Sequence, residues 1–195
     1  KLSLYKEDLI KKNFHSLVPK VLLRYAPGHM RKTVQNHKLY YSNLFDLNKI
    51  KELDVLEPGL STSIGFKYQK SKISKSKQIG EEKLSFAVGQ VVNLDENQDV
   101  PSSSSLDQRF SDIVGETKYN INSNTNFNYN FAIDQSYKKI NYNEVGLDYK
   151  INRAKFNLDF LQERNHIGNT EYIKTGFDFN PNSSTELSFN SKRNL

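Results

Sequence analysis

The chain has 195 residues and carries 28 Lys and Arg against 22 Asp and Glu, which gives a formal net charge of +6 at pH 7. The absence of Cys excludes a disulfide framework, a thiolate zinc site and a cysteine nucleophile. Only 36% of the residues are hydrophobic, but 11 Tyr and 12 Phe exclude a chain that simply stays disordered, so these aromatic side chains need a surface to cover.

The first half of the chain predicts three strands and one long loop. Lys6–Lys12 is the only segment that suggests a helix. The apolar residues of 16–27 predict an irregular strand, and alternating apolar residues predict strands over 60–69 and 84–92, with the long loop at 28–59. No apolar run reaches the roughly 18 residues of a transmembrane helix. The sequence starts without Met or a signal peptide, and we expect it to be a section of a longer protein.

From about residue 113 onward the apolar side chains alternate with the period of two that is typical of a strand with two different faces. The alternation is clearest in 125–134, where large apolar residues and mainly Asn occupy alternate positions. The strands predicted in this half are 113–121, 125–134, 142–151, 155–164, 171–180 and 185–192.

The connections between these strands alternate in length. Asn122–Asn124, Asn152–Ala154 and Pro181–Ser183 are short, whereas Gln135–Asn141 and Asn165–Thr170 are longer. Transmembrane β-barrels combine short periplasmic turns with longer external loops and use strands of about 9–11 residues. The predicted fold is therefore all-β, an antiparallel meander forming part of a large transmembrane β-barrel of the outer membrane. A soluble antiparallel sandwich also alternates and remains an alternative.

In a barrel the two faces of 125–134 meet different surroundings. The longer loops are expected on the cell surface and the short turns in the periplasm, which leaves the basic connection 69–83 unexpectedly long for the periplasmic side. The candidates for the water-filled lumen are Asn126, Asn128 and Asn130, and those for the lipid face are Phe127, Tyr129, Phe131 and Ile133.

The remaining polar segments predict no catalytic or metal site. The basic run Lys67–Lys77 could bind phosphates, but it resembles a solvated loop because no aromatic platform accompanies it. Ser102–Ser105 resembles a flexible loop, and the acidic residues Asp46, Asp54 and Glu57 lack the spacing of a calcium-binding loop. The four His are too scattered to predict a metal site. We therefore predict no enzyme, cofactor or nucleic-acid partner.

Four segments, in order along the chain, resemble one family. They are RYAPG at Arg24–Gly28, NLFDLNKIKELDVLEPG at Asn43–Gly59 leading into GLSTSIGFKY, FAVGQ at Phe86–Gln90, and SDIVG at Ser111–Gly115. The ordered set is similar to the C-terminal barrel region of the outer-membrane lipopolysaccharide (LPS) assembly proteins, the LptD/OstA family. Lys49 stands where Arg is more usual in that family. The family-like positions of the second segment are Asn43, Leu44, Phe45, Asp54, Glu57 and Gly59.

The resemblance implies a function as part of the outer-membrane translocon that inserts LPS into the outer leaflet of the Gram-negative outer membrane. It implies LPS as cargo, an outer-membrane lipoprotein as a plug, and periplasmic LPS-bridge proteins that are reached through a domain outside this sequence. The loop 28–59 is the longest and the richest in family-like residues, so we expect it to reach over or into the lumen. A small barrel of the porin or adhesin type and a soluble β-sandwich binding module remain as alternatives.

Overall fold

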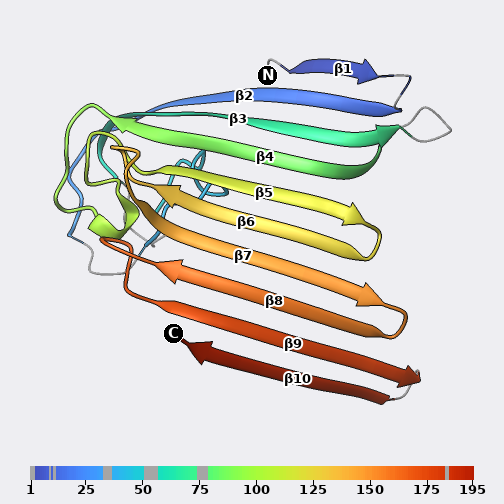
Figure 1. Cartoon of the computed structure of the whole chain (residues 1–195). Helices are drawn as coiled ribbons and strands as arrows, with labels where there is room; N and C mark the ends of the chain where they lie inside the picture. The colour runs from blue at the N-terminus through green and yellow to red at the C-terminus, as the bar shows by residue number, and fades with distance from the viewer. Residues whose placement is uncertain are drawn as a thin grey trace.

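The computed structural model describes residues 3–8, 10, 12–32, 37–50, 57–73, 79–182 and 185–195. In these ranges the chain forms one ten-stranded sheet in which the strands follow their sequence order and each pairs antiparallel with the next (Figure 1). The strands are β1 (Leu4–Asp8), β2 (Asn13–Ala26), β3 (Gly59–Ile73), β4 (Ile79–Asn93), β5 (Ile113–Asn122), β6 (Thr125–Ile133), β7 (Ile140–Ile151), β8 (Ala154–Glu163), β9 (Glu171–Asn182) and β10 (Thr185–Asn194), and the single turn of 3₁₀ helix is η1 (Ser102–Ser104). The predicted all-β antiparallel meander is confirmed.

The helix expected at Lys6–Lys12 is wrong. Lys6 and Asp8 lie in β1, opposite His15 and Asn13 of β2. The local preference of a few charged residues for a helix is weak, and backbone pairing with a neighbouring strand outweighs it. Within the part of the chain that the structure describes, no helix is long and apolar enough to span a membrane.

The connection expected over 69–83 is largely strand. β3 continues to Ile73, which pairs with Ile79 of β4, and Ser71 pairs with Glu82. Two register shifts, on either side of Ser71, let the basic segment stay in the ladder while the strands bend. Positive charge alone does not end a strand, because the backbone hydrogen bonds are satisfied by the partner strand. Residues 74–78 lie outside the described ranges.

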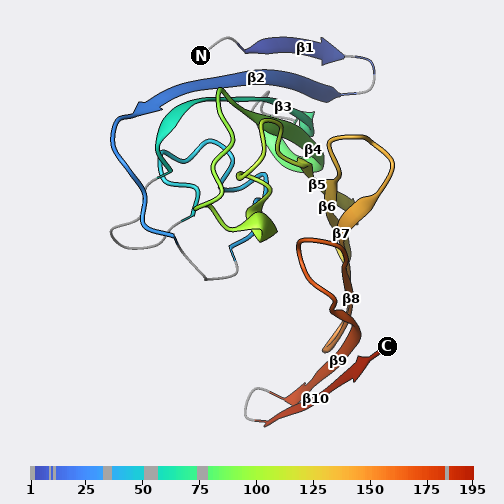
Figure 2. The ribbon, with the colours of Figure 1, turned by 90° about the vertical axis from the view of Figure 1, so that its left-hand side faces the viewer.

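The sheet curves, and two connections fold into its concave side (Figure 2). Gly89, Val114, Ala132, Tyr142 and Glu163 are successive cross-strand partners and therefore lie on one face. Val114, Ala132 and Tyr142 belong to a buried cluster with loop residues, so this face is the concave one. We call it the inner face and the opposite one the outer face.

The outer face carries a broad band of apolar side chains that crosses the sheet from β2 to β10. Its aromatic side chains contact each other across neighbouring strands, as in the row Tyr149, Phe156 and Phe177. Contiguous exposed apolar surface of this extent marks an interaction with a partner or a membrane in a native protein. The large outer-face side chains that are exposed include Leu17, Val21, Leu23, Tyr25, Ile64, Phe66, Tyr119, Leu147, Tyr149, Phe156, Leu158 and Phe189.

The arrangement of all described strands in one sheet can be compared with the two alternatives, a soluble β-sandwich and a small closed barrel. A sandwich needs a second sheet against the apolar face, and all strands that the structure describes lie in one sheet. A small closed barrel needs its first and last strands to pair, whereas β1 and β10 are the two ends of the strand order. Neither arrangement is formed by the described part of the chain.

The longer connections gather at one end of the sheet (Figure 1). These are 27–58, 94–112, 134–139 and 164–170, and the tight turns at 123–124 and 152–153 lie at the opposite end. The predicted grouping of loop lengths is therefore present, and it places four connections from different parts of the sequence close enough to contact each other.

Candidate functional site

Two connections pack on the inner face and form the candidate site. We call residues 37–50 with 57–58 the first inner loop and residues 94–112 the second inner loop. Their apolar residues meet the inner face of β4 to β7 in a single buried cluster. Its members are Leu39, Tyr41, Leu44 and Ile50 from the first loop, Val100 and Leu106 from the second, Ile167 from the β8–β9 connection, and Ala87, Val91, Val114, Ala132 and Tyr142 from the strands.

Two glycines let the first inner loop approach the sheet closely. Gly65 and Gly89 face each other on β3 and β4. Leu44 lies where a side chain on Gly89 would be, and the ring of Phe45 lies 3.2 Å from the position of a Cβ on Gly65. Leu44 is completely buried as a result. The family-like residues of this segment therefore supply the contact between loop and sheet.

A buried ion pair fixes the end of the first inner loop. Arg24 on β2 places Nη1 3.1 Å from Oε2 of Glu57, and the two side chains are 6% and 10% exposed. Arg24 also donates through Nη2 to the backbone carbonyl of Glu57. The other carboxylate oxygen, Oε1, accepts the backbone N–H groups of Lys49 at 3.0 Å and Ile50 at 3.1 Å. One carboxylate thus joins the loop to β2 and closes the loop on itself.

Asn43 shapes the middle of the same loop. Its Oδ1 accepts the N–H of Tyr40 at 2.8 Å, and its Nδ2 donates to the carbonyl oxygens of Lys38 at 3.1 Å and Lys49 at 3.3 Å. Asn43 therefore satisfies backbone groups that the irregular path would otherwise leave buried without partners.

The side chain of Lys49 is buried in the same loop. Burial lowers the pKa of its ammonium group, although the Glu57 carboxylate opposes this shift.

The family-like candidates fall into three groups. Asn43, Leu44, Phe45 and Glu57 are brought together on the inner face, as described above. Gly59 begins β3 with φ of +96°, a conformation that favours glycine. Asp54 lies outside the described residues.

A polar network joins the second inner loop to the start of β7 and to the β8–β9 connection. Oδ2 of Asp112 accepts Nδ2 of Asn141 at 2.9 Å and lies 3.0 Å from Nε2 of His166. Asn165 donates through Nδ2 to Oδ1 of Asn141 at 2.6 Å. The hydrogen bond to the Asp112 carboxylate raises the pKa of His166, against the opposing effect of burial. These groups link the β4–β5 and β8–β9 connections through Asn141 at the start of β7.

A second ion pair ties the first inner loop to a distant strand. Lys38 Nζ contacts Oε1 of Glu163 at the end of β8, and both side chains are less than one-fifth exposed. No local pattern predicted a role for Lys38, Asn141, Glu163 and His166, because they are scattered over 128 positions and only the curvature of the sheet brings them together. The SDIVG segment, which contains Asp112, was the one available signal.

Ser102–Ser105 is not the flexible loop that its composition suggested. Ser104 and Ser105 are 2% and 1% exposed. Ser103 donates to the carbonyl of His37 at 2.9 Å, and Ser105 accepts the N–H of Asp112 at 2.8 Å. The short serine side chains satisfy backbone groups where the two inner loops meet. No group of His, Asp or Glu suited to a metal ion is found among the described residues.

Strand β6 carries the candidates for the two environments. Asn126, Asn128 and Asn130 share the inner face with Ala132, and the four large apolar residues Phe127, Tyr129, Phe131 and Ile133 alternate with them on the outer face. Asn130 donates to Oε2 of Glu144 on β7 at 2.8 Å. The ring of Phe131 lies against Gly115 on the outer face, where a Cβ would collide with it.

The arrangement is a curved sheet with an apolar outer face and a polar inner face that is partly filled by two anchored loops. Comparison with curated proteins gives no match. The family described as LPS transport system D matches residues 2–190. Because this match covers nearly the whole sequence, the chain belongs to the LPS transport system D family, LptD.

Proposed function

We propose that the chain forms part of the wall of an outer-membrane translocon that inserts LPS into the outer leaflet of the Gram-negative outer membrane. The observation that carries this proposal is the separation of the two faces in a chain whose family transports LPS. LPS has the same division, with apolar acyl chains and a phosphorylated, hydrated saccharide. A barrel wall that is apolar outside and polar inside can keep the two parts in different solvents.

In this proposal the outer face meets lipid and the inner face lines the lumen. Phe127, Tyr129, Phe131 and Ile133 then contact acyl chains, and Asn126, Asn128 and Asn130 contact water. The longer connections lie at the cell surface and the tight turns in the periplasm. The two inner loops close the lumen near the cell surface, so the saccharide must pass beside them or they must move.

We expect the plug lipoprotein to contact the inner face of the sheet. On β8 and β9 this face alternates in charge: Asp159 lies opposite Lys174, and Lys155 opposite Asp178. A lipoprotein plug inserted into the lumen would meet these charged groups and the anchored first inner loop. Periplasmic bridge proteins would deliver LPS through a domain outside this sequence.

Complementation of cells depleted of their own family member tests the function. The full-length protein should restore LPS on the cell surface, whereas a variant lacking Asn43–Gly59 should not, when barrel levels are matched. The matched control removes 136–138, an exposed part of another connection at the same end of the sheet. Near-normal surface LPS and normal recovery of the plug lipoprotein with both deletions would contradict the proposal.

A further inference from the structure

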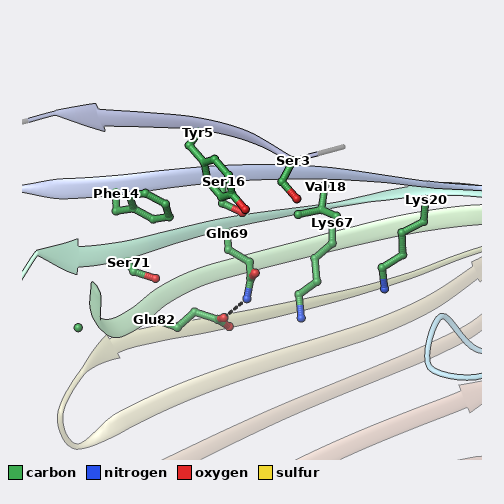
Figure 3. Close-up of a pocket in the computed structure, with 11 residues that line it drawn as sticks. Ser3, Tyr5, Phe14, Ser16, Val18, Lys20, Lys67, Gln69, Ser71 and Glu82 are labelled. Atoms are coloured by element: carbon green, nitrogen blue, oxygen red, sulfur yellow. Dashed lines mark hydrogen bonds between the residues drawn. The ribbon is translucent and has the colours of Figure 1, made fainter. Parts of the chain in front are cut away.

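A hollow of about 550 Å³ opens on the inner face of β1 to β4, and nothing above assigns it a role (Figure 3). The residues described as lining it come from these four strands and from Ser3. It combines two lysines, two aromatic rings and several hydroxyl and amide groups. Binding sites for small ligands typically join apolar or aromatic walls to a few polar groups that orient the ligand.

The two lysines form the cationic part of the hollow. Lys67 on β3 lies opposite Val18 of β2, and Lys20 lies two residues further along β2, on the same face. Figure 3 shows both side chains running side by side with their amines in the hollow. Lys20 is held 5.3 Å from the ring centroid of Tyr41 and 5.2 Å from that of Phe45. Lys67 makes no ion pair with the residues that the structure describes.

The acidic group that the structure describes in the lining is bound by a neighbouring amide. Glu82 on β4 accepts a hydrogen bond from the side-chain amide of Gln69 (Figure 3). Figure 3 shows the Gln69 amide between the Glu82 carboxylate and the amine of Lys67, and Lys20 lies beyond Lys67. Two ammonium groups that share a recess without a carboxylate between them attract an anion with several acceptor oxygens, such as a phosphate.

The aromatic part of the hollow lies near Gln69 and Ser71, on the side of Lys67 away from Lys20 (Figure 3). The rings of Tyr5 on β1 and Phe14 on β2 are 5.5 Å apart and inclined by 31°. Ser16 on β2 lies opposite Tyr5 and is almost completely buried. A sugar ring presents C–H groups on its face and hydroxyl groups at its rim, so it can pack on the rings and bond to the hydroxyls. A free acyl chain would leave most of these polar groups unpaired.

We propose that this hollow binds a phosphorylated saccharide, with Lys20 and Lys67 contacting the phosphate and Tyr5 and Phe14 the sugar. The inference rests on the proposed function, in which the saccharide part of LPS passes along the inner face. In addition, the inner face of β1 to β4 binds LPS at one defined place through a phosphate group. The same phosphate chemistry is present in inorganic phosphate, so the test must separate the two sources.

The experiment measures binding to the full-length protein, purified in detergent with its plug lipoprotein. The probe is a fluorescently labelled phosphorylated core oligosaccharide without acyl chains, and a dephosphorylated sample and inorganic phosphate are the comparison ligands. The variants are Lys67→Gln, Lys67→Arg and Lys20→Gln. The matched control is Lys174→Gln, which removes an exposed inner-face lysine five strands away from β4.

Loss of one charge-assisted hydrogen bond should weaken binding of the phosphorylated oligosaccharide by about tenfold in Lys67→Gln and Lys20→Gln. Lys67→Arg should restore most of the affinity, and the dephosphorylated sample should bind weakly to every variant. Affinities equal to that of Lys174→Gln would overturn the inference, and so would inorganic phosphate binding as tightly as the oligosaccharide. If such variants still restored surface LPS in depleted cells, the proposed function would stand without this site.

Discussion

Removing the charge of Glu57 should release the first inner loop without disturbing the strands. The change Glu57→Gln keeps an oxygen for the N–H groups of Lys49 and Ile50 but leaves the buried Arg24 guanidinium without its counter-charge. Because both side chains are at most 10% exposed, solvent screens the pair poorly. Breaking a buried pair from one side costs about 3–5 kcal/mol, and the retained amide bonds favour the lower end. The fraction of molecules in which the first inner loop has opened should therefore increase on the order of 10²-fold.

Hydrogen exchange in the full-length protein measures this opening directly, because the amides of Lys49 and Ile50 exchange when the loop leaves the carboxylate. The control is Asp148→Asn, which breaks an exposed ion pair with Lys155 whose side chains are 43% and 52% exposed. Such pairs contribute about 0–1 kcal/mol, so that control should leave exchange in the loop unchanged. Exchange no faster in Glu57→Gln than in Asp148→Asn would refute the anchoring role.

Two further perturbations test the packing and the polar network. Gly89→Ala should destabilise the protein by about 1–3 kcal/mol in equilibrium unfolding, because the added methyl group collides with Leu44 and with the backbone oxygen of Ile64. Gly146→Ala should cost less, because the atoms nearest to its added methyl group belong to the rotatable Asn128 side chain. Asp112 raises the pKa of His166 above its ordinary 6.5. The contact between protonated His166 and Asp112 therefore stabilises the fold fully below pH 6.5, and this stabilisation is lost as the pH rises through the folded-state pKa of His166. Proteolysis of the 164–170 connection should accelerate over that rise, and the His166→Gln variant should show no such step.

Local patterns were enough to predict the meander. Alternation over 125–134 and the unequal connection lengths depend on neighbouring residues alone, and both are present in the structure. The family was also predictable, because segments such as RYAPG and SDIVG keep their order along the chain. The division of the β6 residues between two faces of the sheet was predictable as well, since side chains alternate between the two faces of a strand.

The site required information that short patterns do not contain. Arg24 and Glu57 meet across 33 positions, and Lys38 and Glu163 across 125. Their contacts depend on the curvature of the whole sheet and on the Gly65–Gly89 pair that lets Leu44 descend. The error at Lys6–Lys12 has the opposite cause, because local composition was trusted where pairing with β2 decides the structure.

Cysteine labelling of β6 tests most directly whether the outer face meets lipid and the inner face water. This sequence contains no Cys, so Asn128→Cys and Phe131→Cys each introduce one defined thiol on opposite faces of the same strand. In the full-length protein in native outer membrane, a small water-soluble maleimide should label the thiol at position 128 and leave the thiol at position 131 unlabelled. Labelling at 131 with protection at 128 would contradict the assignment of the two faces.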